Sequence, residues 1–292
     1  MFLASADLHL RDDTPVCRTD DYQATQHRKL GFLFDAARTM RVPVLIAGDI
    51  FDHWKPSHKL MANIIEMSEG LSIVVVPGQH DLPNHSLDLL DKSGLAVLRA
   101  SGWLVLNRGL HFTTPQGIVI AGYAFGEDPP KSLKSDVLIW HRMTWTYAIP
   151  YPGCTEPHAN QLLKRYPNVH LIITGDNHRF FTATQGSSTL LNPGSMTRAT
   201  ADQGSHKPRF YAVNDNLTCT AILFPIEPDV ISDVHLVRER EHDAKLEAFV
   251  SRIAKDSEMS LSFEANMDRF LEANKTIPPV RQAVMTAMEK EN

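Results

Sequence analysis

The segment VPVLIAGDIFDHWKPS, residues 42–57, decides the fold, because an apolar run there ends abruptly in Gly48-Asp49. Its apolar part is rich in β-branched residues and is bounded by Pro and Gly, which is typical of a buried strand. The same pattern, an apolar run followed by Asp, His or Gln, recurs at residues 2–9, 73–81, 137–141 and 169–178. We therefore predict five buried strands, each with polar side chains just beyond its carboxyl end.

The segments between these strands have helical periodicity. Helices are predicted over residues 22–40, 57–69, 86–100 and 156–166. Ser57 and Ser86 are predicted N-caps, because a hydroxyl there can accept hydrogen bonds from the free amides of the first turn. Strands that alternate with helices indicate an α/β fold, and in such folds ligands bind at the carboxyl edge of the sheet.

The sequence pattern changes in the last third of the chain. Two strand-like segments, residues 209–213 and 218–224, flank the turn Asn214-Asp215-Asn216, which predicts a hairpin. Beyond Pro228 the sequence is charged and is predicted to be helical over residues 243–255, over 263–274 and, after Pro278-Pro279, to about Lys290. We therefore expect one large domain over residues 1–228 and a small helical region over residues 229–292.

Composition excludes several classes of protein. The chain has 292 residues, is 43% apolar and carries a net charge of −5, as an ordinary globular protein does. No apolar run approaches the roughly 18 residues that span a bilayer, and the N-terminus has no secretory pattern. We therefore expect no membrane association and a cytoplasmic location, in a bacterium or in the host of a phage. Cys17, Cys154 and Cys219 are too widely spaced for a disulfide framework or a thiolate zinc site.

The polar residues that follow the five predicted strands indicate a functional site. A single Gly-Asp pair after a strand is more often a turn than a site. Five such ends in one chain are harder to explain as turns, because strand ends meet in space. Their mixture of carboxylate and imidazole without thiolate favours manganese, iron or zinc. Two such ions about 3.5–4 Å apart can clamp a phosphate and activate a water molecule.

The motifs Asp7-Leu8-His9, Gly48-Asp49, Gly78-Gln79-His80-Asp81, His141 and Gly175-Asp176-Asn177-His178 resemble the signature of the calcineurin-like metallophosphoesterases over roughly residues 1–225. The resemblance implies a four-layer α/β/β/α sandwich of two mixed sheets. By position, it implies ligands of a first metal at Asp7, His9 and His178, a bridging carboxylate at Asp49, and ligands of a second metal at Gln79, His141 and Asp176. His80, beside Asp81, would act as a general acid or stabilise the transition state.

Two positions depart from the pattern of that family. Gln79 stands where the family usually has Asn, and Asp176 stands where it usually has His. Both residues can still supply an oxygen ligand, and Asp176 makes the second metal position more anionic. The departures therefore concern the second metal more than the first.

Within the superfamily, Gly48–Asp52 followed by Pro56-Ser57 resembles the SbcD-type DNA-repair nuclease subunit, as does Asn192-Pro193-Gly194-Ser195. This resemblance implies a manganese-dependent exonuclease or single-strand endonuclease that acts in DNA repair, recombination or replication. It also implies a partner protein, an SMC-like ABC ATPase of the SbcC type, to which the C-terminal helices would bind. A homodimer is a further possible assembly. Candidate contacts to DNA are Asp52, His53, Arg11, Lys55 and Arg179, each of which could equally be an ordinary surface residue.

Two other functions stay open at this stage. A phosphatase or cyclic-nucleotide phosphodiesterase would use the same metal residues in a narrower pocket. Alternatively, the chain would be a DNA-end-binding subunit with weakened catalysis, which Gln79 and Asp176 would explain.

Overall fold

Strands pair into two six-stranded sheets in the computed structural model, which describes residues 1–256 and 263–290. The first sheet has the order β12 (Cys219–Leu223), β11 (Arg209–Val213), β1 (Phe2–Ser5), β2 (Val44–Ile46), β3 (Ile73–Val75) and β4 (Leu104–Val105). The second has the order β5 (Leu110–Thr113), β6 (Val119–Tyr123), β7 (Val137–Trp140), β8 (Leu171–Thr174), β10 (Ser188–Asn192) and β9 (Phe181–Gln185). The central strands of both sheets run parallel; antiparallel strands lie at one side of the first sheet, where β11 and β12 are, and at both edges of the second. Both sheets are therefore mixed, as predicted.

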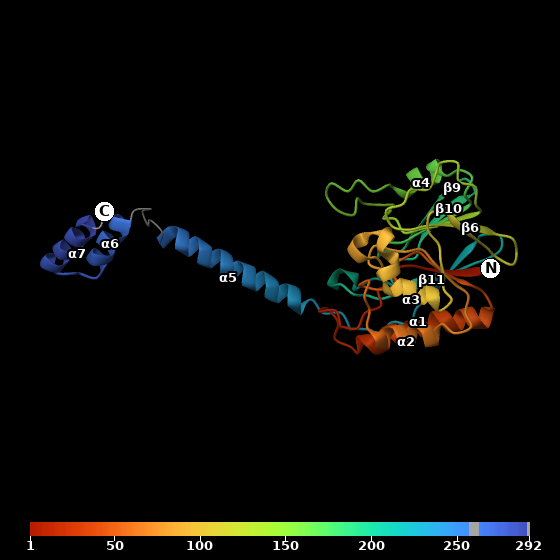
Figure 1. The fold of residues 1–292 in the computed structure, drawn as a ribbon, viewed down its shortest axis with the longest axis horizontal. Helices are drawn as coiled ribbons and strands as arrows, with labels where there is room; N and C mark the ends of the chain where they lie inside the picture. Colours follow the sequence, from red (N-terminus) through yellow and green to blue (C-terminus); the bar gives the residue numbers. More distant parts are fainter. Residues whose placement is uncertain (257–262, 291–292) are drawn as a thin grey trace. The chain divides into compact units, whose positions relative to one another are not determined.

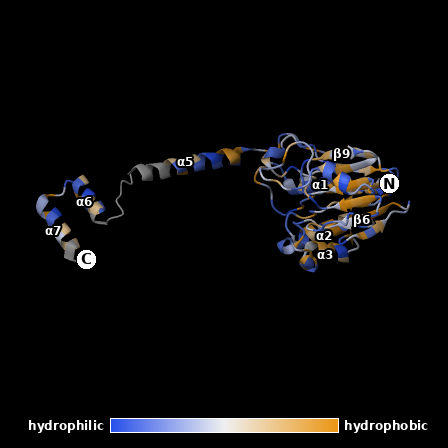
Figure 2. Cartoon of the chain, turned by 90° about the horizontal axis from the view of Figure 1, so that it is seen from above, coloured by the Kyte–Doolittle hydropathy of each residue, from blue (hydrophilic) through white to orange (hydrophobic). Residues whose placement is uncertain are grey.

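The two sheets pack face to face through a shared hydrophobic core. Successive side chains of a strand point to opposite faces, so Leu45 of β2 lies in this core while Val44 and Ile46 face away from it. From the second sheet, Ile139 and Ile173 enter the same core. The central strands are accordingly buried along their whole length, and hydrophobic residues are concentrated in the strands of the sheets in Figure 2.

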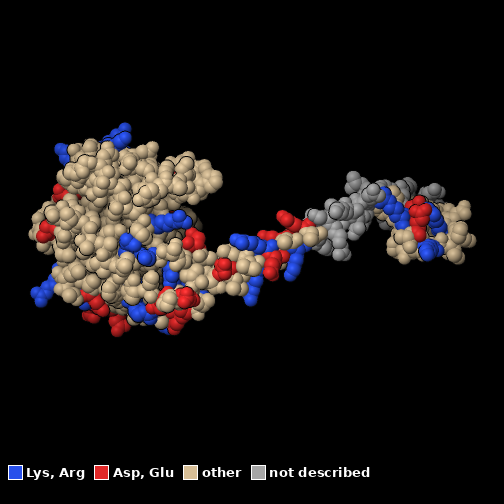
Figure 3. Space-filling model, turned by 180° about the vertical axis from the view of Figure 1, so that it is seen from behind, with Lys and Arg blue, Asp and Glu red and all other residues tan. Residues whose placement is uncertain are grey.

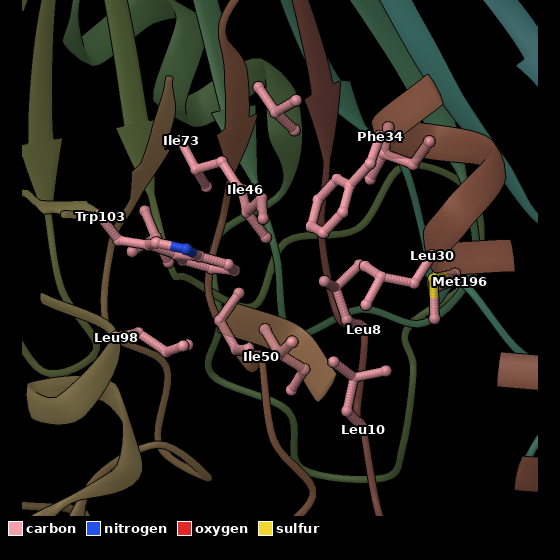
Figure 4. Close-up of a cluster of buried hydrophobic side chains, with 14 of the residues drawn as sticks. Leu8, Leu10, Leu30, Phe34, Ile46, Ile50, Ile73, Leu98, Trp103 and Met196 are labelled. Carbon is pink, nitrogen blue, oxygen red and sulfur yellow. The ribbon is translucent and has the colours of Figure 1, made fainter. Parts of the chain in front are cut away.

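Helices cover the outer faces of the two sheets (Figure 1). The first sheet is covered by α1 (Tyr22–Met40), α2 (His58–Met67) and α3 (Gly94–Ala100), and the second by α4 (Ala159–Arg165). Figure 4 shows Leu30 and Phe34 of α1 in one cluster with Ile46 and Trp103. The layers therefore follow the order α/β/β/α, which confirms the predicted fold.

The predicted helix over residues 86–100 is wrong in its first half. Residues Leu87–Lys92 form a 3₁₀ helix, and α3 begins only after Ser93, whose hydroxyl accepts a hydrogen bond from the amide of Ala96. At the break Ser93 has an extended backbone, and the amide of Gly94 donates to the carbonyl of Trp54. Ser57 caps α2 as predicted, but Ser86 makes no side-chain cap.

The chain divides into two compact units, Met1–Ser232 and Asp233–Asn292. The second unit contains α5 (Val234–Asp256), α6 (Phe263–Ala273) and α7 (Pro278–Lys290). The predicted helix over residues 243–255 begins earlier than expected, at Val234, and α5 carries acidic and basic side chains side by side (Figure 3). Arg281 of α7 pairs with Asp268 of α6 at 2.8 Å. No helix among the described residues combines the length and the apolar character that crossing a bilayer requires.

Candidate metal centre

The carboxyl ends of β1, β2, β3, β7 and β8 bring the predicted ligands together. Ligand atoms lie within 4.8 Å of one another in three overlapping groups: Asp7, His9 and His178; His9, Asp49 and His80; and Asp7, Asp49 and His141. Asp7, His9 and Asp49 each belong to two of these groups. Each group has the mixture of carboxylate and imidazole that divalent transition metals prefer.

Three glycines allow this close approach, because each precedes a predicted ligand and leaves no room for a side chain. A Cβ atom on Gly78 would lie 2.0 Å from Oδ1 of Asp49, and one on Gly48 would lie 2.1 Å from Nδ1 of His141. A Cβ on Gly175 would lie 2.1 Å from the carbonyl oxygen of Ala47. The glycine before each ligand in the sequence is therefore needed for packing between neighbouring strand ends.

Four of the predicted ligands have a left-handed backbone. The φ angles are 49° at Asp7, 44° at His9, 51° at Asp49 and 75° at Asp176. Few residues other than Gly adopt this conformation, although Asp, Asn and His do so more readily than most. Such strain is typical of functional sites, where the surrounding fold holds a side chain in place.

Buried ligand atoms without partners indicate that the site fits a cation. Nδ1 of His141 lies 2.6 Å from the carbonyl of Ala47, which can only accept, so Nδ1 carries a proton and Nε2 is the nitrogen that a metal can bind. That Nε2 lies 3.4 Å from Oδ2 of Asp49. Within the described part of the chain, Nε2 of His141, Oδ2 of Asp49 and Oδ2 of Asp7 are all buried without a hydrogen-bond partner. Burying such atoms is unfavourable unless something else satisfies them, and a divalent cation would do so.

The first metal position contains two imidazoles at short range. Nε2 of His9 and Nε2 of His178 are 3.0 Å apart. At this distance one ring must donate to the other, or both must coordinate the same cation. Nδ1 of His9 lies 3.5 Å from Asp52, whose other oxygen pairs with Arg11 at 3.1 Å. Asp52 and Arg11, expected to contact DNA, thus also orient His9, as outer-sphere partners of metal ligands do.

The pKa values of the buried ligands reflect their crowding. Burial alone would lower the pKa of the His141 imidazole, but the carboxylates of Asp49 and Asp7 raise it to about 10. Burial opposes ionisation of Asp49, yet the neighbouring His141 holds its pKa well below the usual range. Burial raises the pKa of Asp7, and burial together with His9 lowers the pKa of His178 to about 4. The cluster therefore binds protons in its interior, where a metal ion would replace them.

The two residues that depart from the family pattern bind each other. Nε2 of Gln79 donates to Oδ1 of Asp176 at 2.6 Å. The backbone amide of Asp176 donates to Oδ1 of Asp7 at 2.9 Å. Gln79 and Asp176 are thereby attached to the cluster through hydrogen bonds, although neither belongs to the three groups named above.

His80 and Asp81 have different roles in the geometry. Nδ1 of His80 lies 2.8 Å from the carbonyl of Asp52 and must be its donor, which leaves Nε2 available to a substrate. The amide of His80 donates to Asp49 at 2.9 Å. Asp81 is fully buried, and its two oxygens accept hydrogen bonds from the amides of Phe51 and Gly78. Asp81 thus braces the loops that carry Asp49 and Gln79, and it contacts the reacting groups only through them.

The remaining residues that were predicted to contact DNA lie on the protein surface. His53 and Lys55 are exposed, and the His53 ring lies 5.2 Å from the ring of Trp54. Arg179 is exposed, and its guanidinium lies 3.7 Å from Asp202.

A cavity next to the metal cluster was not predicted from the sequence. It has a volume of about 420 Å³, and its lining includes Trp145, Tyr147, Asn177, Arg179 and Phe180. Asn177 places the cavity next to the metal cluster, because it lies between Asp176 and His178 in the chain. The aromatic residues Trp145 and Tyr147, shortly after His141, were the available signal in the sequence.

The sequence profile of the calcineurin-like phosphoesterases matches residues 1–180. No curated protein matches the chain, whereas 155 chains of solved structures do. One crystal structure is 16% identical, covers 77% of this chain and 98% of its own, and has a TM-score of 0.49. The structure of TT1561 of Thermus thermophilus is 12% identical, with coverages of 76% and 97% and a TM-score of 0.48. That of an archaeal phosphodiesterase is 11% identical, with coverages of 76% and 99% and a TM-score of 0.44. The profile spans well over half of the sequence and includes all of the clustered residues, so the chain belongs to the calcineurin-like phosphoesterase family.

Proposed function

We propose that the chain is a phosphodiesterase that cleaves DNA with the help of two divalent metal ions, manganese foremost. Membership of the family supports metal-dependent phosphoester hydrolysis. The clustered carboxylates and imidazoles support a site for two ions. The sequence context of residues 48–57 and 192–195, which resembles SbcD-type nucleases, supports DNA as the substrate.

The observation that carries the choice of DNA is the pairing of aromatic and basic side chains at two places beside the cluster. Trp54 and Lys55 follow one metal motif, and Arg179 and Phe180 follow another. Aromatic faces stack on bases without regard to sequence, and cations contact the phosphates between them. A nucleic-acid strand would use both places at once, whereas a small phosphoester would use only one.

The chain's own groups divide the work of such a reaction. When bound, the metal ions supply a water of lowered pKa and neutralise charge on the phosphate. His80 donates from Nδ1 to the carbonyl of Asp52, which leaves Nε2 for the substrate; with both ring nitrogens protonated, Nε2 would donate a proton to a phosphoryl or leaving oxygen. Asp81 fixes the turn that carries His80, and Asp52 fixes the ring of His9.

A nuclease assay tests the proposal. Purified full-length protein is incubated with labelled single- and double-stranded DNA and with bis(p-nitrophenyl) phosphate, in manganese, in magnesium and in chelator. We expect manganese-dependent cleavage of DNA that chelator abolishes and that the His80→Ala variant, purified in parallel, does not show. Intact DNA alongside hydrolysis of the small diester would refute the DNA assignment.

A specific observation favours a small phosphoester as the second candidate substrate. Two arginines that follow the metal motifs in the sequence have acidic partners. Arg11 pairs with Asp13 at 2.6 Å, and Arg142 pairs with Glu156 at 2.8 Å. These partners weaken the local positive field that a polyanion needs. The phosphatase or cyclic-nucleotide phosphodiesterase alternative predicts hydrolysis of nucleotides and the small diester, with DNA left intact.

The hydrogen bond between Gln79 and Asp176 supports the third alternative, a DNA-end-binding subunit with weakened catalysis. That alternative predicts DNA binding without turnover. It also predicts fewer than two bound manganese ions per chain at saturation.

A further inference from the structure

The two metal positions offer different donor atoms. Around the first position lie two imidazole nitrogens, from His9 and His178, together with the carboxylate of Asp7. At the second, His141 is the one imidazole among the predicted ligands, and the remaining donors are oxygens of Asp49, Gln79 and Asp176. The second position is therefore richer in oxygen than the first.

The hydrogen bond between Gln79 and Asp176 determines which end of the Gln79 amide can bind a cation. A carboxylate only accepts, so the atom 2.6 Å from Oδ1 of Asp176 must be the amide nitrogen of Gln79. Oε1 of Gln79 is then the free end, and it is buried without a partner in the described structure. The same is true of Oδ2 of Asp49 and Nε2 of His141, the other donors assigned to this position.

Asp176 is held in place independently of Gln79. Its backbone is left-handed, with a φ of 75°, and its amide donates to Asp7. With Oδ1 bound to Gln79, its second carboxylate oxygen is left for a cation. The two residues thus form a pair in which each orients the other. Asp176 adds an oxygen where the family usually has an imidazole, and Gln79 keeps an amide oxygen where the family usually has Asn.

We infer that the Gln79–Asp176 pair shifts the preference of the second position from zinc toward a hard cation, Mn²⁺ or Mg²⁺, relative to the first position. Oxygen donors suit magnesium and manganese, and imidazole suits zinc. Supplied with zinc and a large excess of manganese, the protein binds zinc at the first position and manganese at the second. This inference rests on the proposed two-ion centre and does not depend on DNA being the substrate.

Metal competition in solution tests the inference. Metal-free full-length protein is dialysed against about one equivalent of Zn²⁺ per metal position and a large excess of Mn²⁺, and bound metals are counted by mass spectrometry. We expect about one zinc and about one manganese per chain. The electron paramagnetic resonance spectrum should be that of isolated Mn²⁺, because its zinc neighbour is diamagnetic.

Variants connect the selectivity to the pair. Asp176→His supplies an imidazole, so it should raise the zinc-to-manganese ratio at the second position at least about tenfold. The double variant Gln79→Asn/Asp176→His, which carries the residues usual in the family, should bind about two zinc ions. Gln185→Asn, the same shortening on an exposed part of β9, should leave the ratio unchanged. Asp176→Asn keeps the size of the side chain and should weaken manganese binding at the second position alone.

Failure of this inference and failure of the proposed function would give different results. Two zinc ions bound to the parent protein in the mixture would overturn the inference and leave the two-ion centre standing. An unchanged metal ratio in a folded Asp176→His variant would also overturn it. If the parent protein bound neither metal, this inference and the proposed function would both be refuted.

Discussion

The residues of the candidate metal centre fall into two layers that differ in burial and in what holds them. The inner layer is buried and consists of Asp7, His9, Asp49 and His141, while the outer layer is half-buried and consists of Gln79, His80, Asp176 and His178. Backbone groups fix members of the inner layer, as the carbonyl of Ala47 fixes His141. Side chains hold one another in the outer layer, as Gln79 holds Asp176. Both departures from the family pattern lie in the outer layer, at the two positions whose side chains bind each other.

The largest expected effect follows from removing the carboxylate shared by two ligand groups. Asp49→Ala should lose both metal ions and reduce phosphodiester hydrolysis by roughly 10³-fold or more, since bound metals supply several kcal/mol of transition-state stabilisation. Metal analysis and initial rates measure the two effects. Asp88→Ala, which removes an exposed carboxylate, is the matched control. Retention of two tightly bound ions by Asp49→Ala would contradict a bridging role.

In the outer layer, a substitution should separate chemistry from metal binding. His80→Ala should lower turnover by roughly 10²–10⁴-fold, the usual contribution of acid–base catalysis, and leave the metal content near that of the parent. Steady-state rates and metal counting on the same sample measure both. His111→Ala, an exposed histidine on β5, serves as control. Loss of both ions with His80 would place this residue among the ligands instead.

Two glycines should respond in opposite directions to the same added methyl group. Gly78→Ala would force a Cβ against Asp49, so we expect destabilisation by about 1–3 kcal/mol and weaker metal binding. Gly31→Ala meets only Met67, at 3.6 Å, inside helix α1, where alanine should stabilise by about 0.5–1 kcal/mol. Chemical denaturation curves for both variants measure the difference. Equal stabilities would show that the strand ends are not tightly packed.

The smallest expected effect is the release of protons from the site when a metal ion binds. His141, with a pKa of about 10, is protonated at pH 8 and must release about one proton when a metal binds Nε2. His178, with a pKa of about 4, is already deprotonated and releases none. Metal affinity should therefore fall as the pH falls below about 10. Calorimetric titrations in buffers of different ionisation enthalpy count the protons, and binding heats independent of the buffer would contradict this account.

The sequence predicts those parts of the fold whose signal is local. The strands β1, β2, β3, β7 and β8 are buried on both faces, so each appears as an uninterrupted apolar run, and the ligands follow within a few residues. The strands β4, β5, β6, β9 and β10 were not predicted. β4 has only two residues, and the edge strands β5 and β9 are largely exposed and lack apolar runs.

Contacts between distant segments could not be predicted. The bond between Gln79 and Asp176 joins residues 97 positions apart, and neither residue has a local pattern that predicts the other. The cavity lined by Trp145 and Tyr147 depends on the course of the loop between β7 and α4. By contrast, the buried His141 was predictable, because it directly follows an apolar strand.

The left-handed backbone at Asp7, His9, Asp49 and Asp176 restricts which amino acids can occupy these positions at all. Asp, Asn and His are the side chains that tolerate this conformation best, and they are also common metal ligands. Backbone and chemistry therefore impose the same requirement on the sequence. A directed-evolution library at these four positions should recover folded proteins almost only with Gly, Asp, Asn or His, even when it is selected for stability in the absence of any metal.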